Sequence, residues 1–224
     1  MTRSPNVLLV EGTDDLHFLL HLLHRHGFQR AEPVPSERYA IERAGVDDRI
    51  ELKDKEGYDN LARTVQMELT PTHLRRLAAI VDADSDPHAR WGSLSAALRQ
   101  AGYTALPDSL AADGLIVREP DRPVVGVWLM PDNTRSGYIE HFLASMIYPS
   151  DRLWGRAQEC VDGIPEEDRR FVAAHSHKAK VHTWLAWQEY PGTRMPHAVV
   201  RNYVDVNCTA AETFLRWFES WLAT

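Results

Sequence analysis

Two short apolar runs limit the fold of this chain more than any other feature of its sequence. The runs Val7–Val10 (VLLV) and Leu77–Val81 (LAAIV) have the length and composition of buried strands. Each is followed by acidic residues and then by a segment with helical periodicity. Because strands that alternate with helices form sheets with helices on their faces, the sequence predicts an α/β fold with a central, mostly parallel sheet.

The remaining elements are predicted from periodicity and from turn residues. Strands are expected within 39–45 and 49–55, with two more within 114–133, and helices are expected over 14–26, 56–69, 88–103, 136–147 and 210–224. Ser136 is expected to cap the helix that it precedes. A single long helix is expected over 165–189, because Pro165 and the acids after it are typical of a helix N-terminus.

The length of 224 residues fits one large domain or a domain with an elaborated tail. We expect an α/β domain over residues 1–150 and a helical extension over 151–224 that packs on the same domain. With 44% hydrophobic and 25% charged residues, the composition is that of an ordinary soluble globular protein. Apolar runs are shorter than the ~18 to 20 residues that cross a bilayer, so no membrane association is expected. Cys160 and Cys208 match no zinc spacing, and a reduced, cytoplasmic protein is predicted.

The net charge restricts the ways in which this chain could act on a polyanion. The formal net charge is −7, whereas proteins that bind DNA or RNA usually present a basic surface. An acidic protein that handles phosphodiesters therefore needs local basic patches, divalent metal ions, or both.

Acidic residues stand at the ends of both strongly apolar strands. Glu11 directly follows the first strand, and Asp82, Asp84 and Asp86 follow the other. Because parallel strands end at the same edge of a sheet, these acids are expected to meet there, where α/β proteins bind ligands. The spacing of two in VDADSD predicts that the three aspartates point one way if the segment is extended.

Crowded carboxylates raise each other's pKa values unless a cation neutralises them, and their hard oxygens suit Mg²⁺ or Mn²⁺. Either acidic segment alone is more typical of turn and cap chemistry. The two together, each at a strand end, indicate a shared metal site.

The stretches LLVEGTDD and AAIVDADSD together resemble the Toprim domain, a Rossmannoid fold shared by topoisomerases, bacterial primases and OLD-type nucleases. In that fold a glutamate ends the first strand and an Asp-x-Asp pair ends a later one. Glu11, followed by Gly12, matches the glutamate, and Asp82 with Asp84 matches the pair. Asp14 or Asp15 makes the first motif similar to the OLD-type variant, in which extra acids support a two-metal site.

The segment GYIEHFL, with Gly137 and Glu140, resembles a motif of small stand-alone Toprim-like proteins of uncharacterised function. The resemblance spans residues 6 to about 147. The chain departs from the larger relatives, because it has no separate tyrosine-bearing domain, no zinc module and no GxxxxGK[ST] loop. Since these larger architectures do not fit, the resemblance implies a stand-alone protein of this fold that either hydrolyses or only binds its ligand.

The resemblance implies phosphodiester chemistry with Mg²⁺ or Mn²⁺. The candidate metal ligands are Glu11, Asp15, Asp82, Asp84, Asp86 and Glu140, of which Glu11, Asp82 and Asp84 are also candidate catalytic residues. With two metal ions, one activates water and the other stabilises the leaving oxygen, and Asp82 is the candidate bridge. With one metal ion, Glu11 is a candidate general acid or base. The sequence leaves both arrangements open.

Four residues are candidates for substrate binding: Gly12, His17, Lys178 and Lys180. The two lysines could contact a scissile phosphate, and Lys178 is also a candidate catalytic residue. A solvated polar helix face explains the lysines more simply. The polar side of an amphipathic helix explains the histidines of the first predicted helix, with His17 as the exception, because it stands next to the acidic cluster.

Two functions from different classes follow from these residues. The first is a metal-dependent nuclease or related phosphohydrolase. The second is a module without catalytic activity that binds metal together with a nucleotide or nucleic acid, acting with a protein partner or as a homo-oligomer. The acidic net charge favours the second, and the full acidic set favours the first.

Overall fold

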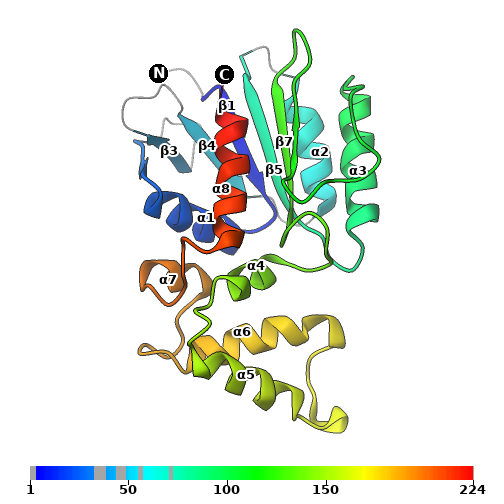
Figure 1. Cartoon of the computed structure of the whole chain (residues 1–224). Coiled ribbons are helices and arrows are strands. Elements are labelled where there is room, and N and C mark those ends of the chain that lie inside the picture. Colours follow the sequence, from blue (N-terminus) through cyan, green and yellow to red (C-terminus); the bar gives the residue numbers. More distant parts are fainter. Residues whose placement is uncertain (1–3, 33–38, 44–48, 55–57, 71–72, 224) are drawn as a thin grey trace.

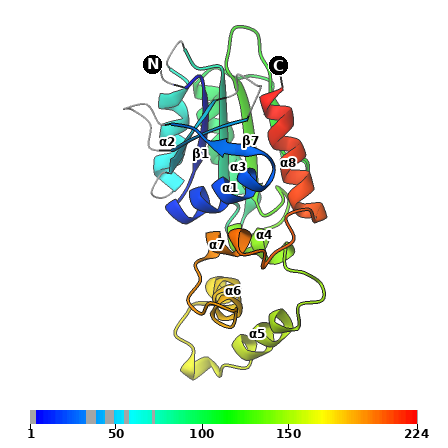
Figure 2. The same cartoon turned by 90° about the vertical axis from the view of Figure 1, so that its left-hand side faces the viewer.

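In this computed structural model, the described residues are 4–32, 39–43, 49–54, 58–70 and 73–223. They form a seven-stranded sheet with helices on both faces (Figures 1 and 2). The strands are β1 (Asn6–Val10), β2 (Phe28–Arg30), β3 (Tyr39–Arg43), β4 (Ile50–Asp54), β5 (Arg76–Asp82), β6 (Leu115–Val117) and β7 (Val124–Met130). Among the predicted segments, residues 1–3, 44–48, 55–57 and 224 lie outside the described part of the chain.

The sheet has the strand order β2-β3-β4-β1-β5-β7-β6. The four central strands, β4, β1, β5 and β7, are parallel to one another. At the edges β3 pairs antiparallel with β4, β2 with β3, and β6 with β7. The predicted α/β fold with a mostly parallel sheet is therefore confirmed.

Eight α-helices accompany the sheet in the described residues: α1 (Thr13–Arg25), α2 (Tyr58–Glu68), α3 (Pro87–Gln100), α4 (Ile139–Ser145), α5 (Arg152–Asp162), α6 (Ser176–Ala186), α7 (Met195–Val200) and α8 (Thr209–Leu222). Alternate residues of β1 enter two different cores, as the period of a strand requires. Leu8 and Val10 pack in the core that includes α1 and α8, whereas Val7 and Leu9 pack in the core that includes α2 and α3. Burial on both faces explains why this strand is apolar throughout.

Helix α8 packs on the sheet through an aromatic stripe. Phe214, Trp217, Phe218 and Trp221 are buried and recur at helical spacing. Gly126 of β7 allows this close approach, because a Cβ at that position would lie 2.9 Å from Trp221 Cδ1. The predicted C-terminal helix is thus confirmed, and it closes one face of the sheet.

Helices α5 and α6 lie together beyond one end of the sheet, with α4 and α7 between them and the strands (Figures 1 and 2). Trp184 of α6 donates a hydrogen bond from Nε1 to Asp151 Oδ2 at the start of α5, at 2.9 Å. Val181 and Trp184 belong to the same apolar core as α1 and α8. The extension therefore continues the core of the α/β part.

The long helix predicted over 165–189 is wrong. The segment contains two short 3-10 helices, Glu166–Asp168 and Ala173–His175, and α6 begins only at Ser176. No residue of either 3-10 helix is buried, so neither has an apolar face against which a longer helix could pack. Helices α5 and α7 and strand β2 were not predicted.

The predicted cap at Ser136 is also wrong, because α4 begins at Ile139 with Tyr138 as its N-cap residue. Two side chains satisfy free amides at this helix start. His141 Nδ1 accepts from the Tyr138 amide at 3.1 Å, and Asp82 Oδ1 accepts from the Ile139 amide at 2.9 Å. The start of α4 is therefore tied to the end of β5.

Every helix among the described residues is too short or too polar to span a lipid bilayer.

Candidate functional site

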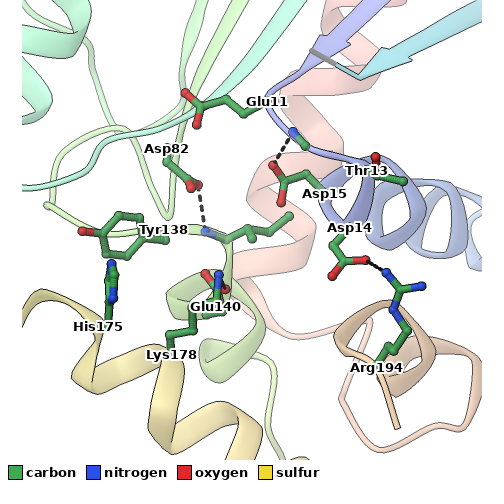
Figure 3. Close-up of a pocket in the computed structure, with 12 residues that line it drawn as sticks. Glu11, Thr13, Asp14, Asp15, Asp82, Tyr138, Glu140, His175, Lys178 and Arg194 are labelled. Carbon is green, nitrogen blue, oxygen red and sulfur yellow. Dashed lines mark hydrogen bonds and ion pairs between the residues drawn. The ribbon is translucent and has the colours of Figure 1, made fainter. Parts of the chain in front are cut away.

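An open cleft of about 680 Å³ lies where β1 and β5 end (Figure 3). Its floor comes from the turn between β1 and α1, from the end of β5 and from the start of α4, and its opposite wall comes from the helical extension. The lining residues are Glu11, Gly12, Thr13, Asp14, Asp15, Asp82, Tyr138, Ile139, Glu140, His175, Lys178 and Arg194.

Glu11 and Asp82 reach the cleft because β1 and β5 are adjacent and parallel. Asp82 is the last residue of β5, and Glu11 directly follows β1, so both side chains emerge at the same sheet edge. The predicted meeting of these two acids is confirmed by their shared place in the cleft lining. Within the described part of the chain, the buried Oε1 atom of Glu11 has no hydrogen-bond partner. A buried carboxylate oxygen without a donor is costly unless a proton or a cation reaches it.

Two further acids complete the floor of the cleft. Asp15 lies in the first turn of α1, and its Oδ2 accepts a hydrogen bond from the Gly12 amide at 3.0 Å. Glu140 lies in the first turn of α4 and is only 6% exposed. Both were predicted as site residues, as was Gly12, and all three line the cleft.

Burial raises the pKa values of three of these carboxyl groups. The pKa of Glu11 rises to about 7, with Asp15 adding to the rise and the charge of Arg90 opposing it. Burial and the neighbouring carboxylates raise the pKa of Asp82 to about 8 and that of Asp15 to about 6. The expected repulsion between crowded acids contributes to these rises, but burial is the larger cause. Near neutral pH the cluster favours binding a proton or a cation over remaining fully ionised.

The extension contributes the basic side of the cleft. Lys178 Nζ of α6 lies 3.1 Å from Glu140 Oε1, and Arg194 Nη2 lies 2.5 Å from Asp14 Oδ1 (Figure 3). Burial lowers the pKa of Lys178, but the Glu140 carboxylate outweighs this effect and the pKa is raised overall. Lys178 therefore stays positively charged, as its predicted role requires.

The sequence analysis missed three residues that line the cleft, namely Thr13, Tyr138 and Arg194. Arg194 is 180 residues from Asp14 and stands in no motif, so nothing local in the sequence connects the two. His175, which shares a face with Lys178 in the sequence pattern, also lines the cleft.

The structure separates Asp84 and Asp86 from the site. Asp84 has a left-handed backbone with φ of 52°, and its backbone pairs with Gly137 through hydrogen bonds of 2.9 and 2.7 Å. Its carboxylate forms an ion pair with Arg90. Asp86 caps α3 by accepting hydrogen bonds from two amides of the first turn. The prediction that the aspartates at 82, 84 and 86 point one way is wrong, because the chain is not extended at Asp84.

Two predicted substrate-binding residues also lie elsewhere. Lys180 Nζ contacts Asp162 Oδ1 of α5 at 2.8 Å and does not line the cleft. The ring of His17 packs edge-on against Tyr39 with centroids 5.2 Å apart, in a second pocket between α1 and the β2–β3 pair. The predicted substrate-binding role in the cleft is therefore wrong for both residues, and Lys180, whose side chain is only 17% exposed, does not lie on a solvated face either.

The donor set of the cleft suits Mg²⁺ or Mn²⁺ by type, because it consists of carboxylate oxygens and includes the unpartnered Oε1 of Glu11. As they stand, however, no three histidine, cysteine, aspartate or glutamate side chains of the described residues are grouped to hold a metal ion. The cleft thus has ligand atoms of the type that Mg²⁺ and Mn²⁺ prefer, but these atoms are not arranged in a complete coordination shell.

A scan against protein-family models matches residues 5–223 to DUF3226, which is described as a protein of unknown function. The match covers nearly the whole chain, and the protein belongs to this family. Searches of curated proteins and of solved structures found no match. Any function must therefore be argued from the cleft itself.

Proposed function

We propose that this DUF3226 protein is a divalent-metal-dependent phosphodiesterase, with a nuclease-like site of the Toprim kind. One observation carries the proposal. Carboxylates from the end of β1, the end of β5, and the first turns of α1 and α4 converge in one cleft, and three of them have raised pKa values. Burying several acids together destabilises a fold. A protein that keeps such a group despite this cost is expected to use it, so the cluster is a candidate functional site.

Mg²⁺ or Mn²⁺ would supply neutralising charge, polarisation of a phosphoryl oxygen and a more acidic bound water. The residues that would hold the ion are Asp82 and Asp15, with Glu140 beside them, which leaves Glu11 free to move a proton. Asp82 is already oriented by its hydrogen bond from the Ile139 amide. Asp84 and Asp86 are left out of this ligand set, because their carboxylates are engaged outside the cleft.

The protein's own groups support proton transfer and phosphate binding. Glu11, with a pKa of about 7, can both accept and release a proton near neutral pH, as a general base or acid requires. Lys178 brings a positive charge to the opposite wall, 3.1 Å from Glu140. Water would attack phosphorus as Glu11 takes its proton, and the bond to the leaving oxygen would break. The leaving oxygen would then take up a proton from Glu11 or from solvent, which yields a phosphomonoester and a hydroxyl group.

The test is cleavage of plasmid, linear and single-stranded DNA and of RNA by the purified protein, with Mn²⁺, with Mg²⁺ and with EDTA. We expect metal-dependent cleavage that Glu11→Gln and Asp82→Ala each lower by at least about a hundredfold. Asp162→Asn is the matched control, because this acid is 60% exposed and pairs with Lys180 away from the cleft. Full activity in the Asp82→Ala protein would remove the site from consideration.

A second function, binding without catalysis, is favoured by one observation. The net charge of −7 disfavours binding and cleavage of long polyanions. Binding of Mn²⁺ with a nucleotide, without cleavage of any of the substrates above, would select this function. A protein partner, a homo-oligomer and a cytoplasmic location stay predictions from the sequence.

A further inference from the structure

The charges of the cleft are divided between its two walls. Its five acids come from the α/β part of the chain: Glu11, Asp14, Asp15, Asp82 and Glu140. Among the described residues, the lysine and arginine that line the cleft, Lys178 and Arg194, both come from the extension, as does His175. Figure 3 shows these basic groups facing the acids across the opening. An anionic ligand would therefore be attracted to the wall formed by the extension.

Each cation is paired with an acid of the opposite wall. Arg194 pairs with Asp14 at 2.5 Å, and these side chains are 64% and 47% exposed. Ion pairs this exposed contribute little to stability, because water screens them and the side chains lose freedom in forming them. The Arg194–Asp14 pair can therefore exchange its carboxylate for a better anion at small cost.

We infer that Arg194 binds a phosphate group of the substrate, and that Asp14 holds this arginine while no substrate occupies the cleft. A guanidinium group matches two phosphate oxygens with a planar pair of N–H donors, and a terminal phosphate, which carries up to two charges, attracts it more strongly than a single carboxylate does. Arg194 stands immediately before α7, so it reaches the cleft from a segment separate from the one that carries Lys178. The cleft therefore has two cations on two separate segments of the extension.

The number of cations also indicates the size of the ligand. Duplex DNA presents one charge about every 1.7 Å of its axis, and its binding normally requires a basic track. Two cations facing five carboxylates do not make such a track. We therefore assign to the cleft a small ligand with one or two phosphate groups, such as the phosphorylated end of a single strand, of which a mononucleotide is the smallest fragment. The choice of phosphate as the anion rests on the proposed function.

The experiment is calorimetric titration of the full-length protein with adenosine monophosphate, with adenosine as the probe that lacks phosphate. The variants are Arg194→Met, Arg194→Lys, Asp14→Asn and the double variant of Asp14→Asn with Arg194→Met. Arg216→Met is the matched control, because Arg216 is an exposed arginine of α8 outside the cleft lining. Circular dichroism checks that each variant is folded.

Arg194→Met should weaken adenosine monophosphate binding by about tenfold to a hundredfold, with Arg194→Lys in between, since lysine keeps the charge but not the paired donors. Asp14→Asn should tighten binding several-fold, but only while Arg194 is present. Adenosine binding should be the same in all variants, and Arg216→Met should match the wild type.

Unchanged binding in Arg194→Met would overturn the inference. So would an equal gain from Asp14→Asn with and without Arg194, because the gain would then come only from the lost negative charge. Tighter binding of a short DNA duplex than of the mononucleotide would overturn the assigned ligand class. These results are separate from the cleavage assay, in which loss of metal-dependent cleavage in Asp82→Ala tests the catalytic proposal whatever Arg194 does.

Discussion

Replacing Asp82 by asparagine should stabilise the metal-free protein at pH 8. Asp82 is buried among other carboxylates, and its pKa is raised to about 8. Asparagine has nearly the same shape, and its Oδ1 can still accept the hydrogen bond that the Ile139 amide donates at 2.9 Å. The substitution thus removes a buried, ionisable group and keeps the contact that ties α4 to β5.

The size of the effect follows from the pKa. A rise from about 4 to about 8 corresponds to roughly 5 to 6 kcal/mol, which is an upper limit for a group that titrates together with its neighbours. Glu11 and Asp15 take up protons in the same range and relieve part of the repulsion. We therefore expect a gain of about 1 to 3 kcal/mol, or about 2 to 12 °C in Tm for a chain of this length.

The pH dependence has a definite sign. A raised pKa means that the folded state holds its proton more tightly than the unfolded chain, so the wild-type protein loses stability as the pH rises from about 4 to about 8. The advantage of the Asp82→Asn variant should be largest at pH 8, small at pH 4 and absent below about pH 3, where Asp82 is protonated in both states. A Glu11→Gln variant should show the same trend over a narrower range, up to about pH 7.

The assay is thermal unfolding in EDTA from pH 4 to pH 8, repeated with Mg²⁺ and with Mn²⁺. Asp162→Asn is again the control and should change Tm little at any pH, because Asp162 is exposed. If the site binds metal, saturating Mn²⁺ should stabilise the wild type more than the variant and reduce or reverse their difference. A lower Tm for Asp82→Asn at pH 8 in EDTA would refute the argument, because it would mean that the ionised carboxylate stabilises the fold.

Three other predictions test the placement of single residues. Asp84→Asn should leave metal-dependent cleavage within a few-fold of wild type, because Asp84 pairs with Arg90 outside the cleft; a loss as large as that of a cleft acid, measured in the cleavage assay, would restore the sequence-based ligand set. Asp151→Ala should lower the free energy of unfolding by about 1 to 3 kcal/mol in urea titrations. The substitution leaves the buried Trp184 Nε1 without its acceptor and removes the N-cap of α5. An unchanged free energy of unfolding would mean that α5 does not depend on this hydrogen bond. Phe214→Ala should lower it by about 3 to 5 kcal/mol in the same titrations, because the ring is fully buried between α8 and the sheet, and a cost below about 1 kcal/mol would contradict that packing.

The acids at the sheet edge could be predicted because their position depends on general rules of α/β folds. Glu11 and Asp82 each follow a run of buried residues, and parallel strands bring such positions to one edge whatever the rest of the chain does. Glu140 could be identified only through a family motif. Nothing in the local sequence showed that the chain turns at Asp84 into a left-handed conformation and directs that carboxylate to Arg90.

The extension was predicted less well, because its helices are short and depend on distant contacts. Helix α5 is held by the bond from Trp184 to Asp151, and α7 packs against α1. Helices of this length gain most of their stability from packing on an amphipathic face, so their boundaries are set by the partners that they meet. The two 3-10 helices between Glu166 and His175 bury no residue, and the predicted long helix does not form there.

Local patterns in the sequence were enough to predict the central parallel strands and the meeting of Glu11 and Asp82 at one edge of the sheet. The tertiary structure was needed to show which of the other acids face the cleft and which basic groups oppose them. Asp14 and Arg194 are 180 residues apart, and their pairing depends on how α7 folds back against α1. Contacts between such distant residues follow from the packing of whole elements, and that packing has no signature in the residues on either side of each partner.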